Sequence, residues 1–126
     1  MGGRPGLGVD IVELPRIEQA LARFGDRFLQ RVYTPAEQAY CRRRIPQLAG
    51  RFAVKEAVSK ALGTGIRRLH WRNIEVLPDA RGAPKVTLYG PALERLARAG
   101  FTAIEVSISH SRDNAVAMAV AVQAAE

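Results

Sequence analysis

The sequence predicts an α+β fold in which an antiparallel sheet packs against a long central helix. In residues 51–62, apolar side chains recur at the three- and four-residue spacing of one helix face, and glycines at positions 63 and 65 end the run. Five short segments instead favour strands, because they are apolar or β-branched and are bounded by turn residues. These segments are residues 7–14, 73–77, 85–89, 104–109 and 115–122.

The remaining helices are marked by proline and glycine. Pro15 opens a helix that ends at Gly25, a shorter segment follows at residues 26–31, and residues 91–99 resume helical spacing before Gly100. The run Thr34-Pro35-Ala36-Glu37 has the pattern of a helix N-cap and predicts a helix to about residue 44, with Pro46 breaking it before the central helix. Trp71 is interpreted as a packing residue.

The last two predicted strands flank a tight turn at residues 110–114, which would hold His110 and Arg112 in fixed positions. Residues 115–122 are almost uninterruptedly apolar, so this strand must be buried on both faces or lie at an interface. Residues 78–82 form the turn of a predicted β-hairpin.

Length and composition fit one globular domain covering residues 1–126, since 48% of the 126 residues are hydrophobic and 25% are charged. There is neither an apolar run long enough to cross a bilayer nor the hydrophobic region of a secretion signal, so we expect a cytoplasmic protein. Cys41 is the single cysteine and has no histidine at metal-ligand spacing, which indicates a structural role.

A net charge of +7 and a pI near 10.5 predict an anionic partner. Nucleic acid, an anionic membrane, a phosphorylated ligand and an acidic protein all satisfy the sign of the charge. A nucleic-acid-binding module is disfavoured, because no such motif is present and aromatic residues make up only 6% of the chain.

Charged residues on the central helix allow two interpretations. Arg51 and Lys55 lie one turn apart, and Glu56 and Lys60 form a neighbouring ridge at the same spacing. Glu56 and Lys60 are either an exposed helical ion pair or a carboxylate for a hard cation with cations one turn away for a phosphate. Asp10 interrupts an apolar run, so it is either held by a structural hydrogen bond or bound to a metal.

Three phrases occur in a fixed order: GVDIVE at residues 8–13, RFAVKEAVSKALGTGI at 51–66 and VSISHSRDNAVAMAV at 106–120. Together they resemble the holo-[acyl-carrier-protein] synthases, the short 4′-phosphopantetheinyl transferases of fatty acid biosynthesis. The similarity covers essentially the whole chain, and it implies a single transferase domain of that type.

The resemblance implies an Mg²⁺-dependent enzyme in which Asp10 and Glu56 bind the metal and act in catalysis. Mg²⁺ is commonly held by one or two carboxylates, with substrate phosphate oxygens and water completing its ligands. The pyrophosphate of coenzyme A would supply those oxygens, and a serine hydroxyl of apo acyl carrier protein would displace 3′,5′-ADP. The base that accepts the serine proton is left open between a metal-bound water and a carboxylate.

The same resemblance assigns the coenzyme A site. It places Lys60 beside a phosphate, in a catalytic and a binding role, and matches His110 and Ser111 to a phrase near the nucleotide phosphates. The glycines around Thr64 would allow the coenzyme to approach the end of the helix. The predicted coenzyme-binding residues are therefore Arg51, Lys60, Gly63, Thr64, Gly65, His110 and Ser111.

Members of the short class are homotrimers with active sites between subunits, and their first helix docks the acidic carrier protein. The expected docking residues here are Arg16, Arg23 and Arg27. Val12 stands where the longer transferases carry a further acidic ligand, which favours the short class, and Asn114 replaces a common aromatic residue. The alternatives are a broad-range transferase acting on peptidyl or polyketide carrier domains and a non-catalytic trimer.

Overall fold

The computed structural model describes residues 3–124 and contains two antiparallel sheets around one long helix. The strands are β1 (Gly6–Glu13), β2 (Ile74–Pro78), β3 (Pro84–Leu88), β4 (Ala103–His110) and β5 (Asn114–Val122). The helices are α1 (Leu14–Phe24), α2 (Asp26–Val32), α3 (Pro35–Cys41), α4 (Ile45–Ala61), α5 (Ile66–Leu69) and α6 (Gly90–Arg98), with a 3₁₀ turn η1 (Trp71–Asn73).

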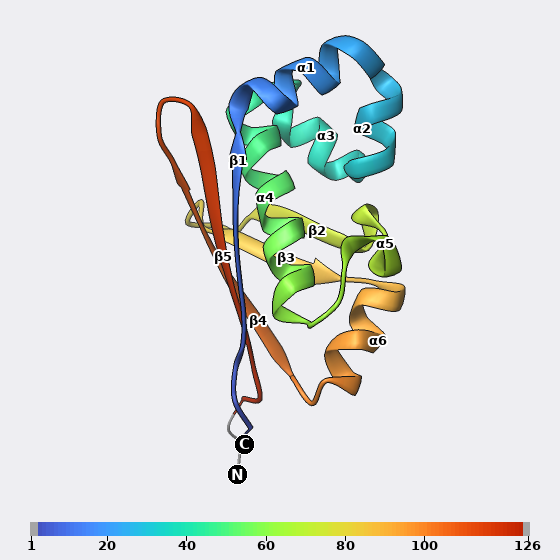
Figure 1. Ribbon diagram of the computed structural model, residues 1–126, viewed down its shortest axis with the longest axis vertical. Helices are drawn as coiled ribbons and strands as arrows, with labels where there is room; N and C mark the ends of the chain where they lie inside the picture. The colour runs from blue at the N-terminus through green and yellow to red at the C-terminus, as the bar shows by residue number, and fades with distance from the viewer. Residues whose placement is uncertain (1–2, 125–126) are drawn as a thin grey trace.

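The larger sheet joins the first and the last parts of the chain. Its strand order is β1-β5-β4, with all pairs antiparallel, so Ala117 on β5 lies opposite both Asp10 on β1 and Ile108 on β4. The smaller sheet is the hairpin of β2 and β3. Figure 1 shows α4 lying along the larger sheet and the hairpin crossing it in the view, with the N and C labels at the same end of the molecule. The predicted α+β fold is confirmed.

α4 is buried on nearly all sides, whereas the sequence pattern predicted one apolar face. Its buried residues include the charged Arg51 and Lys55 as well as Ser59. The helix also starts earlier than predicted, because Pro46 lies in its first turn and opens it rather than separating it from the preceding segment. Such a buried rod gives a rigid support for the polar residues that reach its surface.

Two glycines let β1 lie directly against α4. A Cβ atom at Gly8 would stand 1.9 Å from the Ala57 carbonyl oxygen, and one at Gly6 would stand 2.2 Å from that of Ala61. Both distances are far below van der Waals contact, so any larger residue would push the strand away from the helix. This close approach brings the next inward-facing residue of β1, Asp10, to the surface of α4.

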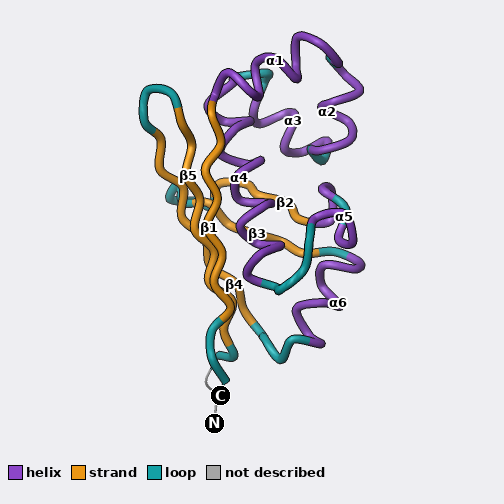
Figure 2. The backbone as a smooth tube through the Cα atoms, viewed as in Figure 1, coloured by secondary structure: helices purple, strands orange, loops and turns teal. Residues whose placement is uncertain are grey.

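The two faces of the larger sheet differ sharply. One face packs on α4 through alternate small residues of β5, namely Ala115, Ala117, Ala119 and Ala121. Figure 2 shows the helices on that side of the sheet only. On the other face Leu7, Val9, Ile11 and Met118 are each more than half exposed. The prediction that β5 would be buried on both faces is wrong for the single chain, which leaves the alternative of an interface.

Several local predictions are confirmed. Thr34 and Glu37 form the predicted capping box, the β2–β3 hairpin is present, and Trp71 packs against Phe52 with ring centroids 4.6 Å apart. The predicted helix to residue 44 is wrong, because α3 ends at Cys41 and the next two residues, Arg42 and Arg43, have positive φ angles. The short α5 and η1 lie in a stretch whose mixed pattern predicted no element.

Candidate functional site

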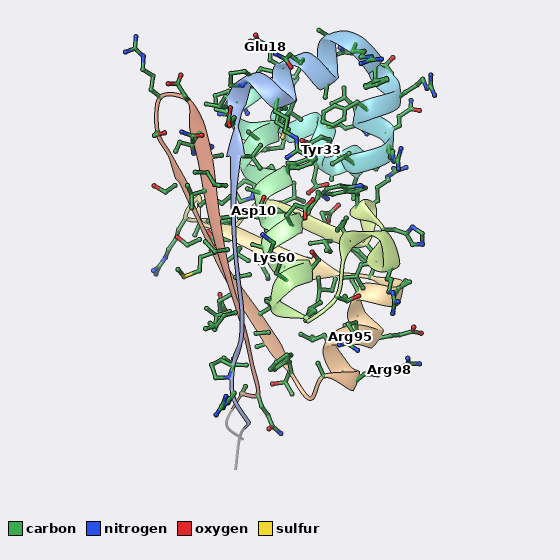
Figure 3. All side chains as sticks on the ribbon, viewed as in Figure 1. Asp10, Glu18, Tyr33, Lys60, Arg95 and Arg98 are labelled. Atoms are coloured by element: carbon green, nitrogen blue, oxygen red, sulfur yellow. The ribbon has the colours of Figure 1, made fainter. Side chains whose placement is uncertain are left out.

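Asp10 and Lys60 meet across the contact between β1 and α4. The Lys60 Nζ lies 3.2 Å from Asp10 Oδ1 and donates a hydrogen bond of 3.0 Å to the Val9 carbonyl oxygen. Figure 3 shows the two labelled side chains close together beside α4. The Asp10 side chain is 18% exposed and that of Lys60 is 53% exposed. The carboxylate is therefore fixed at the edge of the sheet, while the ammonium lies open to solvent.

Glu56 lies one turn before Lys60 and completes this group, which we call the carboxylate site: Asp10, Glu56 and Lys60. Partial burial raises the pKa of Glu56, and the nearby Asp10 carboxylate raises it further. The Lys60 ammonium and the Arg16 guanidinium act in the opposite direction. Two carboxylates from distant parts of the sequence thus lie close enough to repel each other, and the Lys60 ammonium beside them is paired with Asp10.

The sequence left open whether Glu56 and Lys60 form a helical ion pair or belong to a cation-binding site. In the described residues Lys60 is paired with Asp10 rather than with Glu56, so the spacing on the helix does not by itself define the ion pair. Among residues 3–124, the Asp10 side chain has Lys60 as its hydrogen-bond partner and accepts from no backbone N–H group. This arrangement favours a pair of carboxylates that could bind a cation over an ion pair between Glu56 and Lys60 on the helix.

A second polar group lies at the other end of α4. The Arg51 guanidinium stacks on the Tyr40 ring at 4.4 Å from its centroid, and its buried Nε has no hydrogen-bond partner among the described residues. The His110 Nε2–H donates to the Pro46 carbonyl oxygen at 2.9 Å. A Cβ atom at Gly50 would lie only 3.2 Å from that nitrogen, so the glycine makes room for the ring. Ser111 follows His110 in the exposed turn.

The loop of Gly63, Thr64 and Gly65 follows the C-terminal end of α4. At a helical rise of about 1.5 Å per residue, it lies about 25 Å from Pro46 and hence from His110. The loop is held to α6 because Arg95 Nε donates to the Leu62 carbonyl oxygen at 2.9 Å. One chain therefore places this loop near Lys60, and holds Arg51, His110 and Ser111 apart from it.

Lys55, which the sequence places one turn from Arg51, is a buried structural residue rather than a surface cation. Its side chain is fully buried and its Nζ donates to Glu37 Oε1 at 2.8 Å, to the Trp71 carbonyl oxygen at 3.0 Å and to that of Ile74. Glu37 Oε2 in turn accepts from the Val76 N–H at 2.8 Å. The pair thus joins α3, α4 and β2. The sequence did contain a signal for this burial: Lys55 lies between apolar residues of the helix, so a helix covered on all sides would bury it.

The predicted docking arginines lie on the helices at the top of Figure 1. Arg16 and Arg23 on α1 and Arg27 on α2 are exposed, and the Arg16 guanidinium lies 5.2 Å from the Phe52 ring centroid. A cavity of about 370 Å³ separates α1 and α2 from the Phe52–Trp71 pair, and its lining includes Arg27. Arg31, which the sequence did not single out for docking, lines the same cavity.

Across the described residues there is no group of three or more His, Cys, Asp and Glu side chains that could enclose a metal ion. The carboxylate site provides two carboxylates, so a metal held there would need further oxygen ligands from a substrate or water. Within residues 3–124 no helix is long and apolar enough to cross a membrane.

Comparisons with known proteins identify the family of the chain. Residues 6–121 match the family model of the 4′-phosphopantetheinyl transferase superfamily. A holo-[acyl-carrier-protein] synthase of Solidesulfovibrio magneticus is 56% identical over 121 residues, covering 91% of this chain and 95% of the relative. One of Dehalococcoides mccartyi is 49% identical, covering 90% and 95%.

Solved structures show the same fold. The Helicobacter pylori holo-[acyl-carrier-protein] synthase in complex with coenzyme A has a TM-score of 0.83 at 36% identity, covering 91% of this chain and 98% of that one. The Bacillus anthracis enzyme in complex with CoA (3′,5′-ADP) has a TM-score of 0.78 at 38% identity, covering 94% and 96%. The chain therefore belongs to the 4′-phosphopantetheinyl transferase superfamily, and within it to the holo-[acyl-carrier-protein] synthases.

Proposed function

We propose that the chain transfers the 4′-phosphopantetheine group of coenzyme A to a serine of apo acyl carrier protein, with release of 3′,5′-ADP, in fatty acid biosynthesis. The observation that carries this proposal is the carboxylate site, where Asp10 and Glu56 lie together with the Lys60 ammonium beside them. Family membership supplies the reaction class, and this site supplies charges suited to a diphosphate ester.

We propose further that the carboxylate site holds Mg²⁺. The donor set fits, because Mg²⁺ prefers oxygen ligands and is commonly bound by one or two carboxylates together with substrate phosphates. Burial and then repulsion by the Asp10 carboxylate raise the pKa of Glu56, and this repulsion also favours a cation between the two side chains. When bound, the ion would neutralise negative charge on the phosphate under attack.

The chain's own residues orient the reactants around that phosphate. Asp10 is fixed by the sheet and Glu56 by the buried helix, so both carboxylates are held in place at low entropic cost. Lys60 donates to a phosphate oxygen as a point charge, and the glycines at 63 and 65 let the coenzyme approach the helix end. The serine oxygen then forms a bond to the phosphorus that carries the pantetheine arm, and the bond to the oxygen of 3′,5′-ADP breaks.

We place coenzyme A between two subunits. Along α4, the Gly63 loop lies about 25 Å from Pro46, where His110 is held, and about 18 Å from Arg51. The phosphates of one bound coenzyme would not reach both His110 and this loop within one chain. A second subunit could present Arg51 and His110 to the coenzyme held at the first. The unpartnered Nε of Arg51 supports an anion there, because buried guanidinium groups normally have their donors satisfied.

The uncovered sheet face supports the homotrimer that such sharing requires. Val9 lies opposite Met118 in the sheet register, and with Leu7 and Ile11 they make a contiguous apolar surface. A charge in its centre, Met118→Asp, should convert the assembly to monomers and reduce activity. Light scattering after gel filtration measures this, with Lys85→Asp on the separate hairpin as control. A trimer that persists in Met118→Asp would exclude this face.

Carrier-protein docking is proposed for Arg16, Arg23 and Arg27, because exposed cations around a cavity suit an acidic partner. Arg23→Glu should raise the KM for the carrier protein about tenfold, with a larger effect at low salt. The KM for coenzyme A should stay unchanged. An unaltered carrier-protein KM at low salt would remove α1 from the docking surface.

The direct test of the function is product mass. The chain is incubated with coenzyme A, Mg²⁺ and an apo acyl carrier protein, and the carrier should gain one phosphopantetheine group. The ratio of kcat/KM on this carrier and on a peptidyl carrier domain separates the proposed function from a broad-range transferase. We also predict a cytoplasmic location for the chain.

A further inference from the structure

Lys60 is paired with Asp10, one of the two carboxylates that would hold a metal ion at the carboxylate site. Its ammonium contacts Asp10 Oδ1 and the Val9 carbonyl oxygen, the two acceptors that β1 presents toward α4 at this point. We infer that Lys60 is a built-in competitor of the divalent cation, so that the carboxylate site binds metal together with the coenzyme phosphate and binds metal alone weakly. This inference rests on the proposed function and goes beyond it, because it states that the site binds metal more tightly with the coenzyme phosphate than without it.

The two partners differ in freedom of movement. Asp10 is held in the middle of β1, paired with Ala117, and its side chain is 18% exposed. Lys60 is 53% exposed at the end of a flexible four-carbon side chain, near the C-terminal end of α4. Of the two partners, the Lys60 ammonium is therefore the one that would move if a cation were bound, while the Asp10 carboxylate would keep its position.

Charge explains why coenzyme changes the outcome. Asp10 and Glu56 carry two negative charges and Lys60 one positive charge, leaving one net negative charge at the site at neutral pH. A divalent cation entering alone would be repelled by the adjacent ammonium, with Arg16 as the next cation beside Glu56. A diphosphate adds negative charge and offers the ammonium a new acceptor. Binding of coenzyme should therefore increase the affinity of the site for the metal, and binding of the metal should increase its affinity for coenzyme.

A simple phosphate ligand would behave differently. If Lys60 only binds phosphate, its removal weakens coenzyme A binding and leaves metal binding in the absence of coenzyme unchanged. If Lys60 also competes with the metal, its removal tightens metal binding in the absence of coenzyme. Binding of the ion alone separates the two roles without any measurement of activity.

The experiment uses Mn²⁺ alone as the probe, with free Mn²⁺ counted by electron paramagnetic resonance. Lys60→Gln should bind Mn²⁺ about tenfold more tightly than the unaltered chain, because the competing charge is gone. Lys60→Arg keeps the charge and Lys85→Gln removes an exposed charge on the β2–β3 hairpin, so both should bind Mn²⁺ like the unaltered chain. An affinity in Lys60→Gln that is unchanged, weaker or undetectable at millimolar Mn²⁺ would overturn the inference.

A second arm separates this inference from the proposed metal site. With coenzyme A present, Asp10→Asn should lose Mn²⁺ binding, and coenzyme A should tighten Mn²⁺ binding less in Lys60→Gln than in the unaltered chain. Retained binding in Asp10→Asn would contradict the metal site itself. If Asp10→Asn loses Mn²⁺ binding but Lys60→Gln does not bind Mn²⁺ alone more tightly, only the competition by Lys60 would be contradicted.

Discussion

Two neighbouring residues of α4, Lys55 and Glu56, belong to opposite kinds of charged group. All three N–H groups of Lys55 are used, by one carboxylate and two carbonyl oxygens, and the Lys55–Glu37 pair is fully removed from solvent. Glu56 instead is partly exposed, lies near the Asp10 carboxylate, and has the Lys60 and Arg16 cations in its neighbourhood. A buried ion pair whose hydrogen bonds are all formed stabilises one structure. A partly exposed pair of carboxylates instead keeps oxygen atoms available to bind a ligand.

The largest effect should come from the open site. Asp10→Asn and Glu56→Gln should each lower the rate of phosphopantetheine transfer about 10³-fold, because each removes a charge aligned with the reacting phosphate. Circular dichroism should show unchanged folding, and turnover is measured by the mass of the carrier protein. Retained activity in both variants would place the reaction elsewhere.

The buried pair should dominate stability. Lys55→Met leaves the Glu37 carboxylate buried without its countercharge, so the free energy of unfolding should fall by about 3–5 kcal/mol. Lys60→Met removes an ammonium that is 53% exposed, and the free energy of unfolding should change by less than about 1 kcal/mol. Urea unfolding at pH 7 compares the two variants. Equal losses of unfolding free energy in the two variants would contradict the distinction between the buried Lys55–Glu37 pair and the open carboxylate site.

The smallest effect is a gain in stability. Glu56 has a raised pKa in the folded chain, so its ionised form is disfavoured there and the cost is present above that pKa. Below the ordinary value of about 4.5 the carboxyl group is neutral in both states, and the cost disappears. Glu56→Gln should therefore stabilise the metal-free chain at pH 7, by less than about 0.5 kcal/mol after solvent screening.

Thermal unfolding in the presence of a chelator measures this gain. The difference in Tm between Glu56→Gln and the unaltered chain should shrink as the pH is lowered toward 4. A variant that is less stable at pH 7, or a difference independent of pH, would show that Glu56 is a structural residue like Glu37.

Local patterns were sufficient for much of the fold. Capping by Thr34, the glycine after α6 and the hairpin turn act over a few residues, so their sequence signals are direct. The start of α4 could not be predicted from Pro46, because proline both ends one helix and opens the next. Residues 66–73 lack periodicity and their two short elements depend on packing.

The site itself combines residues 46 positions apart, and no spacing rule connects Asp10 with Glu56. Their meeting depends on Gly6 and Gly8, whose importance lies in contacts with α4 that only the structure shows. The resemblance of three phrases to a family supplied the pairing that local physics could not. Burial of Lys55 was missed for a related reason, because periodicity does not reveal how many sides of a helix are covered.

The central claim is that Asp10 and Glu56 together hold a divalent cation that also contacts the diphosphate of coenzyme A. Crystals grown with Mn²⁺ and coenzyme A, measured near the manganese absorption edge, test it directly. The account predicts one anomalous peak in direct contact with both carboxylates and with a phosphate oxygen. A bound coenzyme with no peak there, or with a peak held by other residues, would contradict it.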